Sequence, residues 1–138
     1  MPSTDAWVDT GLLVALFARD DAHHDSAVAF VKEAAPFFFH SIWPVVTEAS
    51  FLLGHEAKDA LYRWLEKGPI RFHELTVRDL PAIRATMKKY RSLEPDFTDA
   101  ALVTLASSQG IHAIATVDVR DFSVYRLPGG KAFVRIWR

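Results

Sequence analysis

The sequence AWVDTGLLVALFA, residues 6–18, places one aspartate between two apolar runs. Residues 6–8 predict a short buried strand and residues 11–18 predict a helix, because continuous apolar runs are typical of elements covered by other parts of a chain. Asp9 therefore follows a predicted strand directly. The same order of strand and helix extends outward from this segment.

Strands and helices alternate along the rest of the sequence. Apolar runs predict strands at 37–39, 70–73, 111–117 and 133–137, and longer patterns predict helices at 22–34, 45–53, 58–66, 79–90 and 97–109. Pro44 and Pro81 fall in first helical turns, where a missing backbone N–H costs little. Gly110 ends the last helix, and LPGG at 127–130 predicts a turn before the last strand.

Strands that alternate with helices predict parallel βαβ units. The predicted strands are continuous apolar runs, as in sheets that are covered on both faces. We therefore expect an α/β fold, a three-layer α/β/α sandwich around a central, mostly parallel sheet of about five strands. We expect residues 1–138 to form a single domain.

The composition is that of a soluble globular protein: 138 residues, 50% of them hydrophobic and 24% charged. No apolar run approaches the roughly 18 residues of a membrane span. The first ten residues, MPSTDAWVDT, have neither the basic nor the apolar region of a signal peptide. We therefore expect a cytoplasmic protein without membrane attachment.

The absence of cysteine excludes disulfides, thiolate zinc sites and thiol nucleophiles. The net charge is −1, from 16 basic and 17 acidic residues. This balance argues against a broad surface that binds nucleic acid by charge alone. The placement of the acidic residues is more informative than their number.

Two aspartates follow predicted strands at the carboxyl end, where ligands bind in open parallel sheets. Asp9 follows residues 6–8, and Asp118 follows residues 111–117. If the two strands are neighbours, both carboxylates reach one crevice. Asp5 stands at the other end of the first strand, roughly 13 Å away at about 3.3 Å per residue, and is left out.

Glu48 and Asp99 lie within predicted helices, on faces that look apolar. Their neighbours three or four residues away are Val45, Phe51 and Leu52 for Glu48, and Leu102 and Val103 for Asp99. A carboxylate on an apolar face is costly unless it is paired or bound to a metal ion.

Each acid also has an ordinary structural role. Asp9 could cap the helix that follows it, and Asp118 could be a turn residue. Asp99 could complete a capping box that Asp96 begins. Glu48 could point outward or pair with a basic residue. The sequence would lack an acidic site only if all four acids had these ordinary roles.

Four carboxylates in one crevice repel one another and require a cation. Oxygen ligands without cysteine suit Mg²⁺ or Mn²⁺. Such ions polarise a phosphoryl oxygen and lower the pKa of bound water. The four acids therefore predict metal-dependent chemistry on a phosphate ester.

Four strings carry a family resemblance: WVDTGLLVALF (7–17), VVTEASFLL (45–53), PDFTDAALVTLASSQGI (95–111) and IATVDVRDF (114–122). In this order and spacing they resemble the PIN-domain family, and within it the VapC-type toxins of prokaryotic toxin–antitoxin pairs. The resemblance implies a parallel sheet flanked by helices and an Mg²⁺- or Mn²⁺-dependent endoribonuclease. Its acidic quartet matches Asp9, Glu48, Asp99 and Asp118.

Several other residues accompany this quartet. The resemblance implies that Thr116 is the family's hydroxyl residue before the last acid, and that Asp96 and Asp121 are additional acids near the site. Thr10 and Thr116 are expected to hydrogen-bond ligands or water. Arg120, two residues past the last acid, either contacts a phosphate or stays at the surface or paired with a carboxylate.

The resemblance also implies a reaction and partners. Activated water attacks the scissile phosphate in line and leaves 5′-phosphate and 3′-hydroxyl ends. The substrate is an RNA, such as a transfer RNA or a ribosomal RNA loop, since RNA recognition usually targets unpaired segments. A homodimer and a cognate antitoxin that covers the acidic site are expected.

Other functions stay open at this point. One is a PIN nuclease of RNA processing without an antitoxin, and another is a PIN-fold module that binds RNA or protein without cleaving it. A phosphatase with an aspartyl nucleophile is disfavoured, because Thr10 and Gly11 follow Asp9 where a D-x-D motif is usual. A dinucleotide site is excluded by the lack of a G-x-G-x-x-G turn.

The basic and histidine residues have structural interpretations. Adjacent His23 and His24 point about 100° apart on a helix, so they chelate poorly. The resemblance implies that Asp21 and His24 fix the start of the second helix. Lys88, Lys89 and Arg91 suit a helix C-terminus, with RNA contact as the alternative.

The aromatic residues divide into two groups. Residues 37–39, FFF, predict a buried strand, and Trp7 is expected in the core. Four others are expected either in the core or in a dimer or antitoxin groove: Trp43, Phe51, Tyr62 and Trp64.

Overall fold

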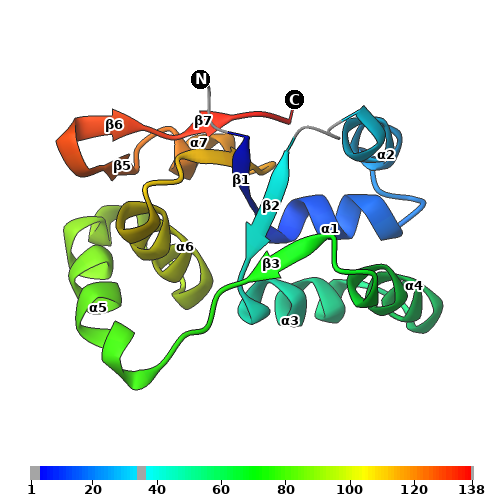
Figure 1. Cartoon of the computed structure of the whole chain (residues 1–138), viewed down its shortest axis with the longest axis horizontal. Helices are drawn as coiled ribbons and strands as arrows, with labels where there is room; N and C mark the ends of the chain where they lie inside the picture. The colour runs from blue at the N-terminus through cyan, green and yellow to red at the C-terminus, as the bar shows by residue number, and fades with distance from the viewer. Residues whose placement is uncertain (1–3, 34–36, 138) are drawn as a thin grey trace.

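A five-stranded parallel sheet forms the centre of the fold, in the order β3-β2-β1-β4-β7 (Figure 1). The computed structural model describes residues 4–33 and 37–137. The strands are β1 (Asp5–Val8), β2 (Phe38–Ser41), β3 (Ile70–Phe72), β4 (Ala113–Ala115) and β7 (Val134–Arg135). Each pairs in parallel with its neighbours, which confirms the predicted sheet.

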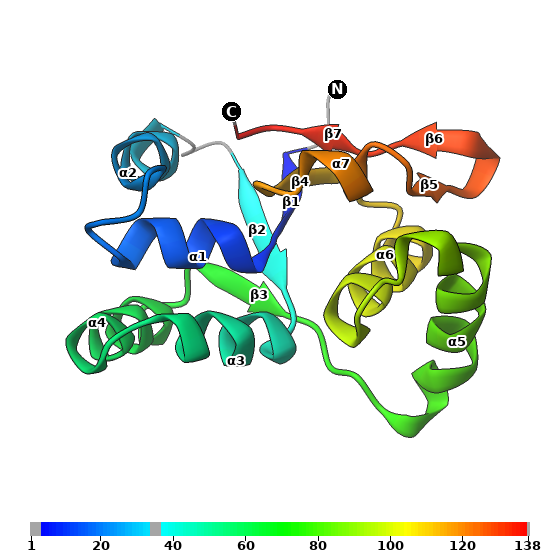
Figure 2. The ribbon, with the colours of Figure 1, turned by 180° about the vertical axis from the view of Figure 1, so that it is seen from behind.

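Helices cover both faces of the sheet and complete the predicted three layers (Figures 1 and 2). On one side lie α1 (Thr10–Phe17), α2 (His24–Glu33), α3 (Trp43–Leu52) and α4 (His55–Glu66), and α1 contacts the other three. On the other side, α5 (Leu80–Lys89) packs against α6 (Phe97–Gln109). In the described part of the chain, no helix is long and apolar enough to cross a membrane.

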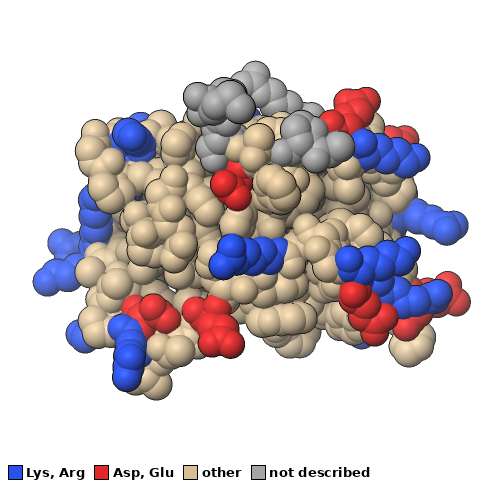
Figure 3. All heavy atoms as spheres, viewed as in Figure 1, with Lys and Arg blue, Asp and Glu red and all other residues tan. Residues whose placement is uncertain are grey.

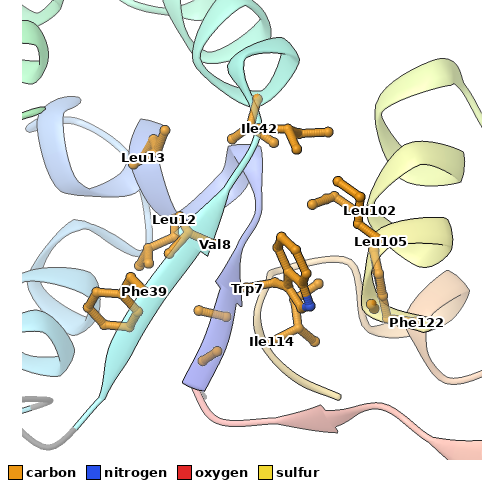
Figure 4. Packing of buried hydrophobic residues seen from close by; sticks show 14 of the residues in the cluster. Trp7, Val8, Leu12, Leu13, Phe39, Ile42, Leu102, Leu105, Ile114 and Phe122 are labelled. Atoms are coloured by element: carbon orange, nitrogen blue, oxygen red, sulfur yellow. The ribbon is translucent and has the colours of Figure 1, made fainter. Parts of the chain in front are cut away.

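The sheet's core is packed from both helical layers, as Figure 4 shows. Leu12 and Leu13 of α1 approach one face, and Leu102 and Leu105 of α6 approach the other. Trp7 of β1 lies at the centre, fully buried, and its indole N–H donates to the Ile111 carbonyl at 2.9 Å. The prediction of Trp7 as a core residue is therefore confirmed.

The boundaries of several elements differ from the predictions. Two short 3₁₀ helices, η1 (Val77–Asp79) and η2 (Arg91–Leu93), flank α5, and α3 and α4 begin earlier than predicted. Residue 34, the predicted end of the second helix, lies outside the described residues. The strands predicted at 111–117 and 133–137 shorten to β4 and β7, because the chain leaves the sheet at Thr116 to form the acidic loop described below.

The LPGG turn belongs to a small second sheet that the sequence did not predict. β5 (Arg126–Leu127) and β6 (Lys131–Ala132) pair antiparallel around a 3₁₀ turn, η3 (Pro128–Gly130). Gly129 has φ of 81° there, a conformation that favours glycine. Before this hairpin, one further short helix, α7 (Val119–Phe122), follows β4.

The prediction of a buried strand at 37–39 is wrong in part: the strand is Phe38–Ser41, and only one of its two phenylalanines is buried. Side chains alternate along a strand, so Phe38 and Phe39 point to opposite faces. Phe39 packs against Phe30 of α2 and is buried, whereas Phe38 is 69% exposed. Two other aromatic side chains lie at the surface on α3, Trp43 and Phe51, and Tyr62 of α4 is also exposed.

The buried indole of Trp7 predicts a large cost for its replacement. Trp7→Phe leaves a void and removes the donor from the buried Ile111 carbonyl, so we expect a loss of about 2–4 kcal/mol in the free energy of unfolding. Urea denaturation measures it. The control is Trp43→Phe on the exposed surface, which should change stability by less than about 0.5 kcal/mol; equal losses would contradict the packing described here.

Candidate metal centre

Pairing of β1 with β4 brings Asp9 and Asp118 to one edge of the sheet. Val8 pairs with Ala115, and the Asp9 backbone N–H donates to the Ala115 carbonyl at 3.1 Å. Thr116 then joins the two acids: its hydroxyl donates to Asp9 Oδ2 at 2.8 Å and accepts from the Asp118 N–H at 2.9 Å. The predicted adjacency of the two strands is therefore confirmed, and the buried Thr116 fixes the orientation of the Asp9 carboxylate.

Glu48 reaches the same edge from α3. Its Oε2 accepts from the Thr10 hydroxyl at 3.0 Å, and its Oε1 accepts from the Thr98 hydroxyl at 2.9 Å. The sequence argument that Glu48 lies on an apolar face is wrong in part, because Phe51 and Leu52 are 84% and 67% exposed. Two threonine hydroxyls, from α1 and α6, hold this carboxylate beside the other acids.

Asp99, in the first turn of α6, faces Asp118 and Asp121 across the loop after β4. One carboxylate oxygen from each of these three residues lies within 4.8 Å of the others, a separation that one metal ion can bridge. Asp96 caps α6 and lies beside them. The structure thus gathers the four quartet acids with Asp96 and Asp121, two of the additional acids expected near the site.

The structural alternatives are also present in the geometry. Asp9 caps α1 by accepting from the Thr10 N–H, and Asp118 caps α7 by accepting from the Asp121 N–H. Asp96 accepts from the Asp99 N–H at 2.9 Å, which is half of a capping box. These bonds leave Asp99 without a donor to its carboxylate among the described residues. Asp9, Asp96 and Asp118 therefore cap helices and also belong to the acidic cluster. Their capping hydrogen bonds fix the positions of their carboxylates.

The acids raise one another's pKa. Burial and then neighbouring carboxylates, with Asp9 and Asp96 foremost, raise the pKa of Asp99 to about 8. Burial also raises the pKa of Asp9 to about 6, against the donation from Thr10 and Thr116, and raises the pKa of Asp118. In residues 4–33 and 37–137, no lysine, arginine or histidine forms an ion pair with these acids.

Tyr125 is a residue of this site that sequence reasoning missed. It is fully buried, and its hydroxyl has no hydrogen-bond partner among the described residues. Burial raises its pKa, and Asp99 and Asp121 raise the pKa further. A buried hydroxyl without a partner, beside acids without a counter-charge, is the environment expected for a site completed by a hydrated cation.

Comparison with known proteins shows which family has this arrangement. The sequence profile of the PIN domain family matches residues 6–127, which include every acid described above. The chain belongs to the PIN domain family. No curated protein sequence gives a significant match.

A solved structure shares the fold of this PIN domain. The crystal structure of Mycobacterium tuberculosis VapC20, a sarcin–ricin loop-cleaving toxin, superposes with a TM-score of 0.75. The two chains are 23% identical, and the match covers 83% of this chain and 91% of that one. At this identity the likeness shows a common fold.

The donor set fits a hard divalent cation. All the converging groups are carboxylates and hydroxyls, which suit Mg²⁺ or Mn²⁺ better than softer metals. Asp99, Asp118 and Asp121 have the spacing to bind such an ion directly. The oxygens of Asp9 and Glu48 already accept from hydroxyl or backbone donors. Because a carboxylate oxygen has a second lone pair, these bonds orient the two acids and leave them able to bind a metal ion.

The remaining polar predictions lie outside this cluster. His24 Nδ1 contacts the Ala15 carbonyl at 2.8 Å, and the His23 N–H donates to Asp21 at 2.8 Å, which confirms a structural role for this helix start. Asp5 contacts His40 at 2.7 Å, away from the acids, in agreement with its exclusion. Arg120 is exposed and lowers the pKa of Asp118; its contact with a phosphate stays a prediction.

The raised pKa of Asp99 predicts how stability depends on pH in EDTA. Between 3.8 and about 8, folded Asp99 holds a proton that the unfolded chain has lost, so its contribution to stability falls as pH rises through this range. Asp99→Asn removes this cost. We expect the variant to melt at a higher temperature than the wild type, with a difference that grows with pH. A difference in melting temperature that stays constant with pH across this range would contradict the raised pKa of Asp99.

The unpartnered hydroxyl of Tyr125 predicts a stabilising substitution. Tyr125→Phe removes a buried polar group without a partner and keeps the ring contacts with Tyr90 and Phe122. In EDTA we expect a gain of about 1 kcal/mol in the free energy of unfolding, measured with urea. Tyr90→Phe is the matched control and should lose stability, because its hydroxyl accepts from the Arg126 N–H at 2.9 Å. A loss for Tyr125→Phe would show that its hydroxyl has a partner.

Proposed function

We propose that this PIN domain is an Mg²⁺- or Mn²⁺-dependent endoribonuclease that hydrolyses RNA phosphodiesters, with the function of a VapC-type toxin. The observation that carries the proposal is the convergence of Asp99, Asp118 and Asp121 to within 4.8 Å, beside Asp9 and Glu48 and with no ion pair to a basic side chain among the described residues. An uncompensated acidic site is costly for a fold to maintain, and a bound divalent cation offsets that cost.

We assign metal binding to Asp9, Asp99 and Asp118, with Glu48 acting directly or through water, and with Asp121 and Asp96 as further acids. A divalent cation bound by these residues would polarise a phosphoryl oxygen and lower the pKa of a bound water. The alternative role for Glu48 is to help take the proton from the attacking water. In-line attack leaves 5′-phosphate and 3′-hydroxyl ends.

The hydroxyl groups hold the carboxylates in place for this reaction. Thr116 orients Asp9, while Thr10 and Thr98 orient Glu48 from two different helices. Each donor satisfies one oxygen and restricts the rotation of the acid. This preorganisation means that the acids need not rearrange when the phosphate arrives.

The expected partners follow from the toxin assignment. The VapC20 structure is described as that of a toxin that cleaves the sarcin–ricin loop, and we propose an unpaired RNA segment, in a transfer RNA or a ribosomal RNA loop, as the substrate class here. A cognate antitoxin and a homodimer belong to the same proposal. The exposed side chains of Phe51, Leu52 and Tyr62 offer apolar surface for either contact.

Cleavage of total cellular RNA by the purified protein tests the proposal. We expect cleavage with Mn²⁺, none with EDTA, and at least a 100-fold loss in Asp9→Ala, since one catalytic group is typically worth about 10²–10⁴-fold. Asp25→Asn is the matched control, because Asp25 is an exposed acid in the first turn of α2. It should cleave at the wild-type rate.

Two results would overturn the proposal. One is cleavage that persists in Asp9→Ala purified in the same way, which would identify a contaminating nuclease. The other is an unchanged melting temperature on adding Mn²⁺, with no cleavage of any RNA. Glu48→Gln should reduce the melting shift caused by Mn²⁺, which tests the acidic site apart from catalysis.

A further inference from the structure

An aromatic cavity lies beside the acidic site, between the starts of α3 and α6 and the connection that follows β3. Its volume is about 380 Å³, within the range of about 300–1,000 Å³ typical of small-molecule sites. The lining residues are Trp43, Pro44, His73, Glu74, Leu75 and Phe97. Figures 1 and 2 show the connection from β3 running between α3 and α6 toward α5.

Trp43 is held as a flat surface at this cavity. Its ring stacks on Phe72 of β3 with centroids 4.2 Å apart and planes 12° from parallel, yet the residue remains 56% exposed. Phe97, another lining residue, is 44% exposed. Large aromatic side chains that are ordered on one side and open on the other are typical of stacking platforms for bases.

The cavity and the acidic site are formed by the same two helices. Trp43 precedes Glu48 on α3 by five residues, about 7.5 Å along the axis and about 140° around it. Phe97 precedes Thr98, whose hydroxyl donates to Glu48 at 2.9 Å, and lies on a different face of α6 from Asp99. An RNA strand that passes from the acids around the starts of these helices would reach the two rings.

We propose that this cavity is a nucleobase subsite, in which Trp43 and Phe97 hold an unpaired base of the RNA bound at the acidic site. The proposal rests on the nuclease function proposed above. Lysine and arginine side chains are scattered over the face in Figure 3 and form no continuous patch there. Stacking supplies the affinity that the balanced net charge of −1 does not.

The polar groups of the cavity favour a base that donates hydrogen bonds. Asp5 contacts His40 Nε2 at 2.7 Å, and His40 Nδ1 contacts His73 Nε2 at 2.8 Å. If the carboxylate accepts from Nε2–H of His40, then His40 Nδ1 accepts from His73, and the remaining nitrogen of neutral His73 is an acceptor. The carboxylate of Glu74 is also an acceptor. Cytosine, with its amino group, suits this pair better than uracil, which has a carbonyl oxygen there.

RNA binding by an Asp99→Asn background, which is expected not to cleave, tests the subsite. The probe is a fluorescein-labelled ten-residue oligoribocytidylate, followed by fluorescence anisotropy in Mg²⁺ at low salt. Added Trp43→Ala or Phe97→Ala should weaken binding by about 5- to 150-fold, the range of one base stacked on an aromatic ring. Trp43→Phe should restore most of the affinity. Phe51→Ala, another exposed aromatic of α3 outside this cavity, should change it less than about twofold.

The chemistry of the ligand is tested with two further probes. An oligomer of abasic riboses should bind weakly and should not distinguish Trp43→Ala from its parent. Oligouridylate should bind several-fold more weakly than oligocytidylate. Glu74→Ala should reduce this ratio of affinities. Circular dichroism and the melting temperature of each variant establish that it is folded.

Unchanged affinity in Trp43→Ala and Phe97→Ala, or no measurable binding by the parent, overturns the subsite. An effect of Trp43→Ala on self-association alone would assign the cavity to a protein contact and also overturn it. Nuclease activity is measured separately, in the protein without the Asp99→Asn substitution. Mn²⁺-dependent cleavage with Trp43-independent binding leaves a nuclease without this subsite, whereas Trp43-dependent binding without cleavage leaves an RNA-binding module.

Discussion

The parallel pairing of β1 with β4 is the contact on which the rest of the acidic site depends. It places the ends of two strands, more than one hundred residues apart in sequence, within reach of one threonine hydroxyl. Thr116 bonds to the Asp9 carboxylate and to the Asp118 backbone, so the two loops cannot move independently. Trp7, two residues before Asp9, holds the same strand in the core through its hydrogen bond to the Ile111 carbonyl.

The acids around this contact act against the stability of the fold. Their burial and mutual repulsion raise the pKa of Asp99 to about 8 and that of Asp9 to about 6. A soluble domain without a use for these groups would gain by replacing them or pairing them with basic residues. The cation that we propose would offset this repulsion beside the Tyr125 hydroxyl, which has no hydrogen-bond partner among the described residues. The electrostatics of the site are connected in this way to the proposed hydrolysis of RNA.

The helix α3 connects the chemistry to recognition. Glu48, near its middle, contributes to the acidic site, and Trp43, at its start, forms one wall of the aromatic cavity. The Thr98 hydroxyl bonds to Glu48 from α6, and Phe97 beside it lines the same cavity. A displacement of α3 relative to α6 would therefore alter the positions of a carboxylate and of a stacking surface together.

Local pattern in the sequence was sufficient for the helices α1–α6, the strands of the parallel sheet and the prediction of the four acids. Asp9 and Asp118 were identified because they follow apolar strands directly, and the order of residues shows which end of a strand they occupy. The exposure of Phe38 was mispredicted and that of Phe51 was left open, because neighbouring residues do not reveal where a helical layer ends.

Thr98 and Tyr125 gave no signal that distinguished them from ordinary core residues. Only the tertiary structure decided their roles, since a hydroxyl acquires its partner, or lacks one, through contacts between segments far apart in the chain. Sequence alone determined which acids the chain carries and where they stand on its strands and helices. The packing of α3 and α6 around the end of the sheet decided the distances between these acids, their pKa values and the aromatic cavity beside them. The sequence could not show these features, because contacts between distant segments leave no periodic pattern in it.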